Sequence, residues 1–80
     1  MQYKTSDIVL ASCLKLNGFE LETIHVDPNG KGTFVFVGVE ASFIQNFDLG
    51  KVLVEPVAFN NTIKQLTTSV RRLNNKVSTD

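Results

Sequence analysis

The 80-residue sequence has few of the residues that build metal centres and catalytic sites. It contains one cysteine, Cys13, and one histidine, His25, so neither an internal disulfide nor a Cys/His zinc cluster can form. A Cys13–His25 nucleophile pair would lack a third group to orient the histidine. The eight acids are scattered, with no spacing that fixes two carboxylates for acid–base catalysis. We therefore expect a protein that is not an enzyme and needs no cofactor or metal.

Long apolar segments and an excess of charge are also missing. No run approaches the roughly 20 apolar residues that span a bilayer, and no signal peptide is recognisable, so we expect a cytoplasmic protein without membrane contact. The formal net charge of zero disfavours a nucleic-acid binder that neutralises many phosphates. The cations are nevertheless concentrated, because residues 60–80 carry four cations and one acid.

The N-terminal half predicts a helix followed by a β-hairpin. Thr5 or Ser6 can cap the helix, and Gly18 suits a left-handed position just after its end. The buried stripe of this helix is expected to contain Val9, Leu10, Cys13 and Leu14. Segments 19–26 and 33–40 alternate like strands around the turn sequence DPNGKG. A bulge near Thr23 would keep the apolar side chains of the first strand on one face.

The C-terminal half predicts a short helix, a strand and a long helix. Phe43, Ile44 and Phe47 suit one to two helical turns ending near Gly50, and KVLVEP suits a third strand. Apolar residues then recur at alternating spacings of four and three, which is a helical stripe. That stripe consists of Phe59, Ile63, Leu66, Val70, Leu73 and Val77. The helix begins at Pro56 or at a cap at Asn60 or Asn61, and residues 76–80 are expected to be a frayed tail.

These elements predict one α+β domain over residues 1–80. We expect a three-stranded antiparallel sheet with the N-terminal and C-terminal helices packed on it, and a short helix between strands two and three. A chain of this size buries only about 60% of the surface that its unfolded form exposes, so a partner subunit would stabilise it.

Several motifs together resemble a small family of uncharacterised domains from bacteria and their phages. Residues 3–7 read YKTSD and precede an apolar helix and a glycine, and the second hairpin strand contains FVFV at residues 34–37. The chain closes with Pro56 and an F-x-x-x-I-x-x-L helix from Phe59. Residues 47–50 read FDLG, where family members usually carry an aromatic followed by Asn-Gly. The resemblance implies this fold and a bacterial or phage origin, and it supplies no catalytic residue.

The segment TFVFVGVE at residues 33–40 is apolar on both faces, which leads to our first functional hypothesis. Two helices can cover one face of a three-stranded sheet, so the other face would need a second cover. A homodimer supplies that cover, and the resulting protein-interaction module would use Phe34, Phe36, Val70 and Leu73. The alternative is that the short helix around Phe43 folds over the second face within one chain.

A second hypothesis is a nucleic-acid-binding accessory or regulatory protein. Single-strand binders combine aromatic side chains on a sheet with nearby cations. The cations available for this role are Lys31, Lys51, Lys64, Arg71 and Arg72, around Phe34 and Phe36. Against it, cations near the end of a helix also serve as a solvated face that favours the helix dipole.

Overall fold

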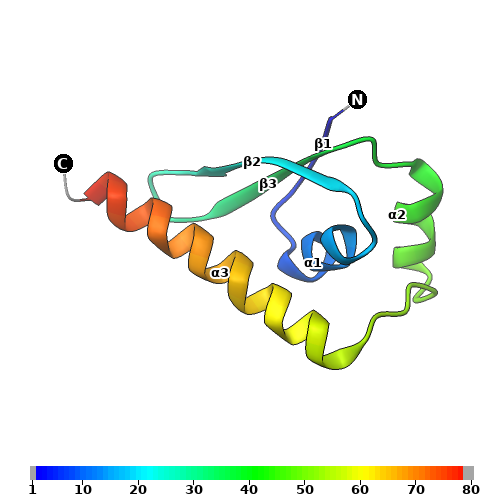
Figure 1. The fold of residues 1–80 in the computed structure, drawn as a ribbon. Coiled ribbons are helices and arrows are strands. Elements are labelled where there is room, and N and C mark those ends of the chain that lie inside the picture. Colours follow the sequence, from blue (N-terminus) through cyan, green and yellow to red (C-terminus); the bar gives the residue numbers. More distant parts are fainter. Residues whose placement is uncertain (1, 79–80) are drawn as a thin grey trace.

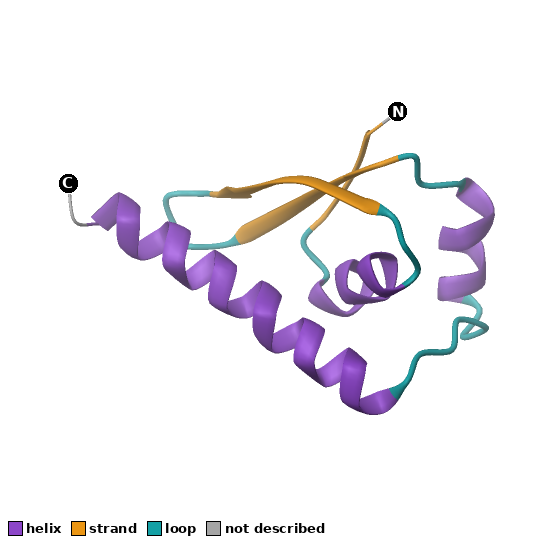
Figure 2. Ribbon diagram, viewed as in Figure 1, coloured by secondary structure: helices purple, strands orange, loops and turns teal. Residues whose placement is uncertain are grey.

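A computed structural model describes the backbone of residues 2–78 and the side chains of residues 2–75. Its elements are β1 (Gln2–Thr5), α1 (Ile8–Leu16), β2 (Glu20–Val26), β3 (Gly32–Val37), α2 (Ala41–Asp48) and α3 (Pro56–Ser78). The strands form an antiparallel sheet in the order β1-β3-β2. Figure 1 shows α1 and α3 beneath the sheet and α2 beyond one of its ends, and Figure 2 separates helices from strands in the same view. The predicted α+β fold with a three-stranded antiparallel sheet is confirmed.

The third strand is not the segment predicted from the sequence, KVLVEP. Gln2–Thr5 pairs with β3, whereas residues 51–55 form no regular secondary structure and pair with no strand in residues 2–78. The short helix α2 consequently follows both hairpin strands instead of lying between strands two and three. Val52 and Val54 are half-buried, whereas Lys51, Leu53 and Glu55 are exposed. An extended segment lying against its own domain has the period-two pattern of a strand, which explains the error.

The ends of α1 follow from local chemistry. The Asp7 carboxylate accepts hydrogen bonds from the backbone N–H groups of Val9 and Leu10, at 2.9 and 3.3 Å, so Asp7 is the cap instead of Thr5 or Ser6. At the other end Gly18 takes a φ of 88°, and the Phe19 N–H donates to the Leu14 carbonyl at 3.1 Å. This is the expected Schellman ending.

The buried face of α1 differs from the predicted stripe at one position. Leu10, Cys13 and Leu14 are buried as expected, but Val9 is exposed. Ala11 and Ser12 are buried in its place, because α1 lies between the sheet and α3 and is covered on more than one side.

The hairpin has the predicted turn and the predicted bulge. The Asp27 carbonyl accepts from the Gly30 N–H at 2.9 Å, and its carboxylate accepts from the Lys31 N–H at 2.9 Å. Gly30 has a φ of 86°, which a residue with a side chain rarely adopts. The register of β2 against β3 shifts between Leu21 and Thr23, where the bulge was expected.

The long helix begins at Pro56, which is the first of the two starts predicted from the sequence, and not at Asn60 or Asn61. The Glu55 carboxylate accepts from the N–H groups of Val57 and Ala58 at 2.7 and 2.9 Å and caps the helix, while Pro56 occupies its first position. The backbone is helical to Ser78, so the predicted frayed tail does not begin at residue 76; residues 79–80 lie outside the described part of the chain. Among the described residues, no helix is both long and apolar enough to cross a bilayer.

The two faces of the sheet are covered very differently. On the helix side, Phe34 and Phe36 join one buried cluster whose other members are Leu10, Ala11, Leu14 and Leu66. Phe43 of α2 packs against the same cluster and meets Phe19 edge-on, with ring centroids 5.0 Å apart. The short helix therefore extends the first core instead of covering the second face.

The second face needs no apolar cover. Val35 lies there between Lys4 of β1 and Thr23 of β2, which pair with it directly, and it is buried although both neighbours are exposed and polar. The central position of β3 explains this burial, because a side chain in the middle strand is flanked from both sides.

Candidate functional site

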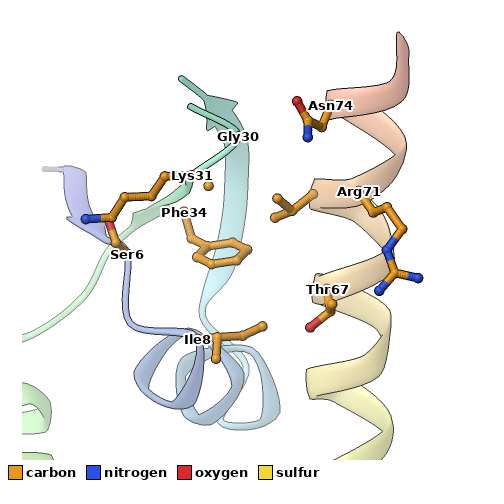
Figure 3. Close-up of a pocket in the computed structure, with 10 residues that line it drawn as sticks. Ser6, Ile8, Gly30, Lys31, Phe34, Thr67, Arg71 and Asn74 are labelled. Carbon is orange, nitrogen blue, oxygen red and sulfur yellow. The ribbon is translucent and has the colours of Figure 1, made fainter. Parts of the chain in front are cut away.

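A cleft opens between the hairpin and the C-terminal half of α3, and we call it the hairpin cleft (Figure 3). Its volume is about 370 Å³. Ile8, Phe34 and Val70 form its apolar floor, and Gly30 and Gly32 contribute a hairpin wall without side chains. The rim is polar and consists of Ser6, Lys31, Thr67, Arg71 and Asn74. None of the described residues that line this cleft is acidic.

The wall of the cleft is held by a close approach of backbone to side chain. A Cβ atom placed on Gly32 would lie 2.7 Å from Cγ2 of Val70, which is much nearer than carbon atoms normally approach. Asn74 lies one helical turn beyond Val70 in α3, and a Cβ atom placed on Gly30 would lie 3.1 Å from its side-chain nitrogen. The C-terminal half of α3 thus rests directly on the hairpin backbone.

The predicted dimer interface does not form one exposed surface. Phe34 and Phe36 are 2% and 0% exposed because α1 and α3 cover them, so they cannot meet a second copy. Val70 is half-buried against the core and against Gly32. Leu73 alone is exposed. The hypothesis that the phenylalanine row faces a partner is therefore wrong.

The five predicted nucleic-acid contacts are separated into three places. Lys31 and Arg71 line the hairpin cleft, whereas Lys64 and Arg72 line a shallow polar depression on another face of α3. Lys51 lies in the connection between α2 and α3. Phe34 and Phe36 are buried, so a nucleic-acid base cannot stack on either ring. Nucleic-acid binding stays a prediction that this arrangement does not favour.

A second feature, which the sequence analysis missed, is the connector segment, residues 51–55. Its central residue Leu53 is 90% exposed, and Val57 at the start of α3 is 65% exposed. Leu53 and Leu16 flank one hollow of about 300 Å³. The sequence contained one indication of this feature. Leu53 shares the solvent-facing side of the alternating segment with the charged residues Lys51 and Glu55. An apolar residue at that position is unusual for a solvent-facing row.

His25 and Cys13, the two residues considered for catalysis or metal binding, lie in different surroundings. His25 is exposed on β2, and the residues that the structure describes contain no group of three His, Cys, Asp or Glu side chains suited to a metal ion. Cys13 is free and buried. Desolvation by burial is the main cause that raises the pKa of its thiol, and the negative charge of Asp7 is the second. A raised pKa disfavours the thiolate that a nucleophile requires.

Comparison with known proteins gave no relative. No protein-family model matches the chain, and searches of curated proteins and of solved structures found no significant match. The resemblance to a bacterial and phage family therefore stays a prediction.

Proposed function

We propose that the protein is a small, non-enzymatic interaction module of the cytoplasm that pairs with a second copy of itself through the connector segment. The observation that carries this proposal is Leu53, which is 90% exposed at the centre of a segment whose burial alternates from residue to residue. Exposed apolar residues scattered singly are ordinary, but here Leu16 and Val57 are also exposed near the segment.

The backbone of the connector segment supports pairing with another strand. The N–H and C=O groups of Val52, Leu53 and Val54 form no backbone hydrogen bond within the described chain. The neighbouring Lys51 N–H donates to the Asn46 carbonyl at 2.8 Å, which fixes where the free stretch begins. An extended stretch with unpaired backbone groups is a template for a further strand.

The sequence of the segment favours an identical partner. If two copies pair antiparallel about a twofold axis at Leu53, each Leu53 lies opposite the Leu53 of the other copy. Lys51 then lies opposite the copy's Glu55, and the opposite charges attract across the pair. The same patch thus complements itself, as a twofold interface requires.

The amount of exposed surface is also consistent with a partner. The accessible surface is 5442 Å², whereas a compact monomer of 8.9 kDa averages about 4,800 Å². The radius of gyration is 13.1 Å, compared with about 11.6 Å expected for 80 residues. The excess of about 600 Å² is slightly less than the roughly 800 Å² that one partner contributes to a standard interface. We therefore expect a dimer of moderate affinity, with a Kd in the micromolar range.

Sedimentation equilibrium of the wild type and two variants tests the proposal. Leu53→Asp brings two carboxylates together at the axis, so we expect a folded monomer. The matched control, Leu73→Asp, places the same change on an exposed leucine of α3 and should leave the dimer intact. Far-UV circular dichroism checks that both variants fold. A wild type that stays monomeric at several hundred micromolar, or a Leu53→Asp variant that still dimerises, would refute the proposal.

A further inference from the structure

The hairpin cleft combines an apolar floor with cations at its rim, which is the arrangement of a site for an amphipathic anion. We propose that it binds a small organic anion with an apolar body, of the class of medium-chain carboxylates. The apolar body would lie mainly on the half-buried Ile8 and Val70, because Phe34 is only 2% exposed, and the carboxylate would lie at the rim near Arg71 or Lys31. This proposal is independent of self-association, because Leu53 does not line the cleft.

The two rim cations have no carboxylate partner among the side chains of residues 2–75. Both Lys31 and Arg71 are exposed, and among the described side chains neither forms an ion pair with a carboxylate. In Figure 3 the Lys31 side chain extends past Ser6, away from α3, and the Arg71 side chain lies on the side of α3 that is turned away from the hairpin. Neither charged group therefore covers Ile8 or Val70 in this structure.

The two acids closest in sequence to lining residues already have backbone partners. Asp7 accepts from two N–H groups of α1, and Asp27 accepts from the N–H groups of Asn29 and Lys31, both at 2.9 Å. One oxygen of each carboxylate, Oδ1, is thus bound by backbone N–H groups. The remaining polar side chains of the rim are uncharged, and Thr67 and Asn74 point from α3 toward the hairpin (Figure 3). Their hydroxyl and amide groups can donate hydrogen bonds to a carboxylate.

The size and composition of the cleft narrow the class of ligand. A volume of about 370 Å³ is near the lower limit of the roughly 300–1,000 Å³ of small-molecule pockets. Inorganic phosphate would leave the apolar surface of Ile8 and Val70 unused, and an uncharged alkyl chain would leave both cations without a partner. A compound with one carboxylate and a short alkyl chain uses both features.

Nuclear magnetic resonance titration of the isotope-labelled protein tests the proposal with three probes: octanoate, 1-octanol and inorganic phosphate. We expect octanoate to shift the amide signals of Ile8, Gly32 and Val70 and to bind up to about fivefold more tightly than 1-octanol, since one exposed charge contact contributes up to about that factor. Phosphate should produce weaker shifts. The double variant Lys31→Gln/Arg71→Gln should bind octanoate and octanol equally.

The matched control is the double variant Lys64→Gln/Arg72→Gln, which removes the same charge from another face of α3 and should bind octanoate like the wild type. The proposal is overturned if octanoate and octanol bind the wild type equally, or if phosphate alone reproduces the octanoate shifts. Octanoate shifts centred on the connector segment would also overturn it, because they would show adsorption to exposed leucines.

Discussion

Replacing Gly32 by alanine probes the contact on which the hairpin cleft depends. The new Cβ atom would lie 2.7 and 3.1 Å from the two terminal methyl carbons of Val70, whereas carbon atoms pack at about 3.5–4.0 Å. Either α3 or the hairpin must move by nearly 1 Å, and such overpacking costs about 1–3 kcal/mol. The substitution also restricts the unfolded chain, which contributes about 0.4–1 kcal/mol in the opposite direction. We expect a net loss of about 1–2 kcal/mol of unfolding free energy.

A double-mutant cycle separates this clash from other effects. Val70→Ala removes the methyl groups that collide with the new side chain, so Gly32→Ala should cost less in the Val70→Ala background than in the wild type. The expected coupling is at least about 1 kcal/mol, measured by urea unfolding followed by far-UV circular dichroism. Free energies that add within about 0.3–0.5 kcal/mol would show that α3 does not rest on Gly32.

Two further predictions concern single polar side chains. Ser12 is fully buried and its hydroxyl has no hydrogen-bond partner among the described residues, so Ser12→Ala should stabilise the protein by about 1–2 kcal/mol; an unchanged or lower urea midpoint would contradict this. Hydrogen bonds from the Val57 and Ala58 N–H groups lower the pKa of the Glu55 carboxyl below its ordinary value of 4.5. The charged form is thus favoured by folding, and its contribution is present above the unfolded pKa and lost as the pH falls through the folded pKa. Glu55→Ala should therefore destabilise the protein near neutral pH and much less in acid, and a difference that does not vary between these conditions would contradict the cap.

The features that the sequence predicted correctly are those that depend on local chemistry. The hairpin turn follows from Pro28 and Gly30, and the helix ending follows from Gly18, because each of these residues restricts or permits backbone angles at its own position. The bulge near Thr23 follows from the requirement that one face of a strand stay apolar. Each signal lies within a few residues of the structure that it specifies.

The errors concern contacts between distant residues. β1 pairs with residues 34–37, about thirty positions away, and nothing in QYKT itself marks a strand whose partner is the centre of the sheet. The segment 51–55 has the same alternation but no partner in the described chain. The periodicity of a segment indicates which of its side chains face inward. It does not indicate which helix or strand packs against them.

The candidate sites depended on the same missing information. Both rows of β3 are apolar, and the sequence could not show that Val35 would be buried between two polar neighbours. Once the phenylalanine row was assigned to the helices, the predicted dimer interface disappeared. The hairpin cleft was equally hidden, because it requires Val70 to lie against Gly32 across 38 positions of sequence.

Disulfide formation by a Leu53→Cys variant tests self-pairing of the connector segment most directly. A twofold axis at residue 53 brings the two Cβ atoms to about 4.5–5.5 Å, close to the separation that a disulfide needs. The native Cys13 is buried and the pKa of its thiol is raised, so the introduced cysteine is the reactive one. With mild oxidation at micromolar concentration, we predict a covalent dimer for Leu53→Cys and none for Lys64→Cys, an exposed control on α3. Equal cross-linking of the two variants, or no cross-linking at residue 53, would contradict the proposed interface.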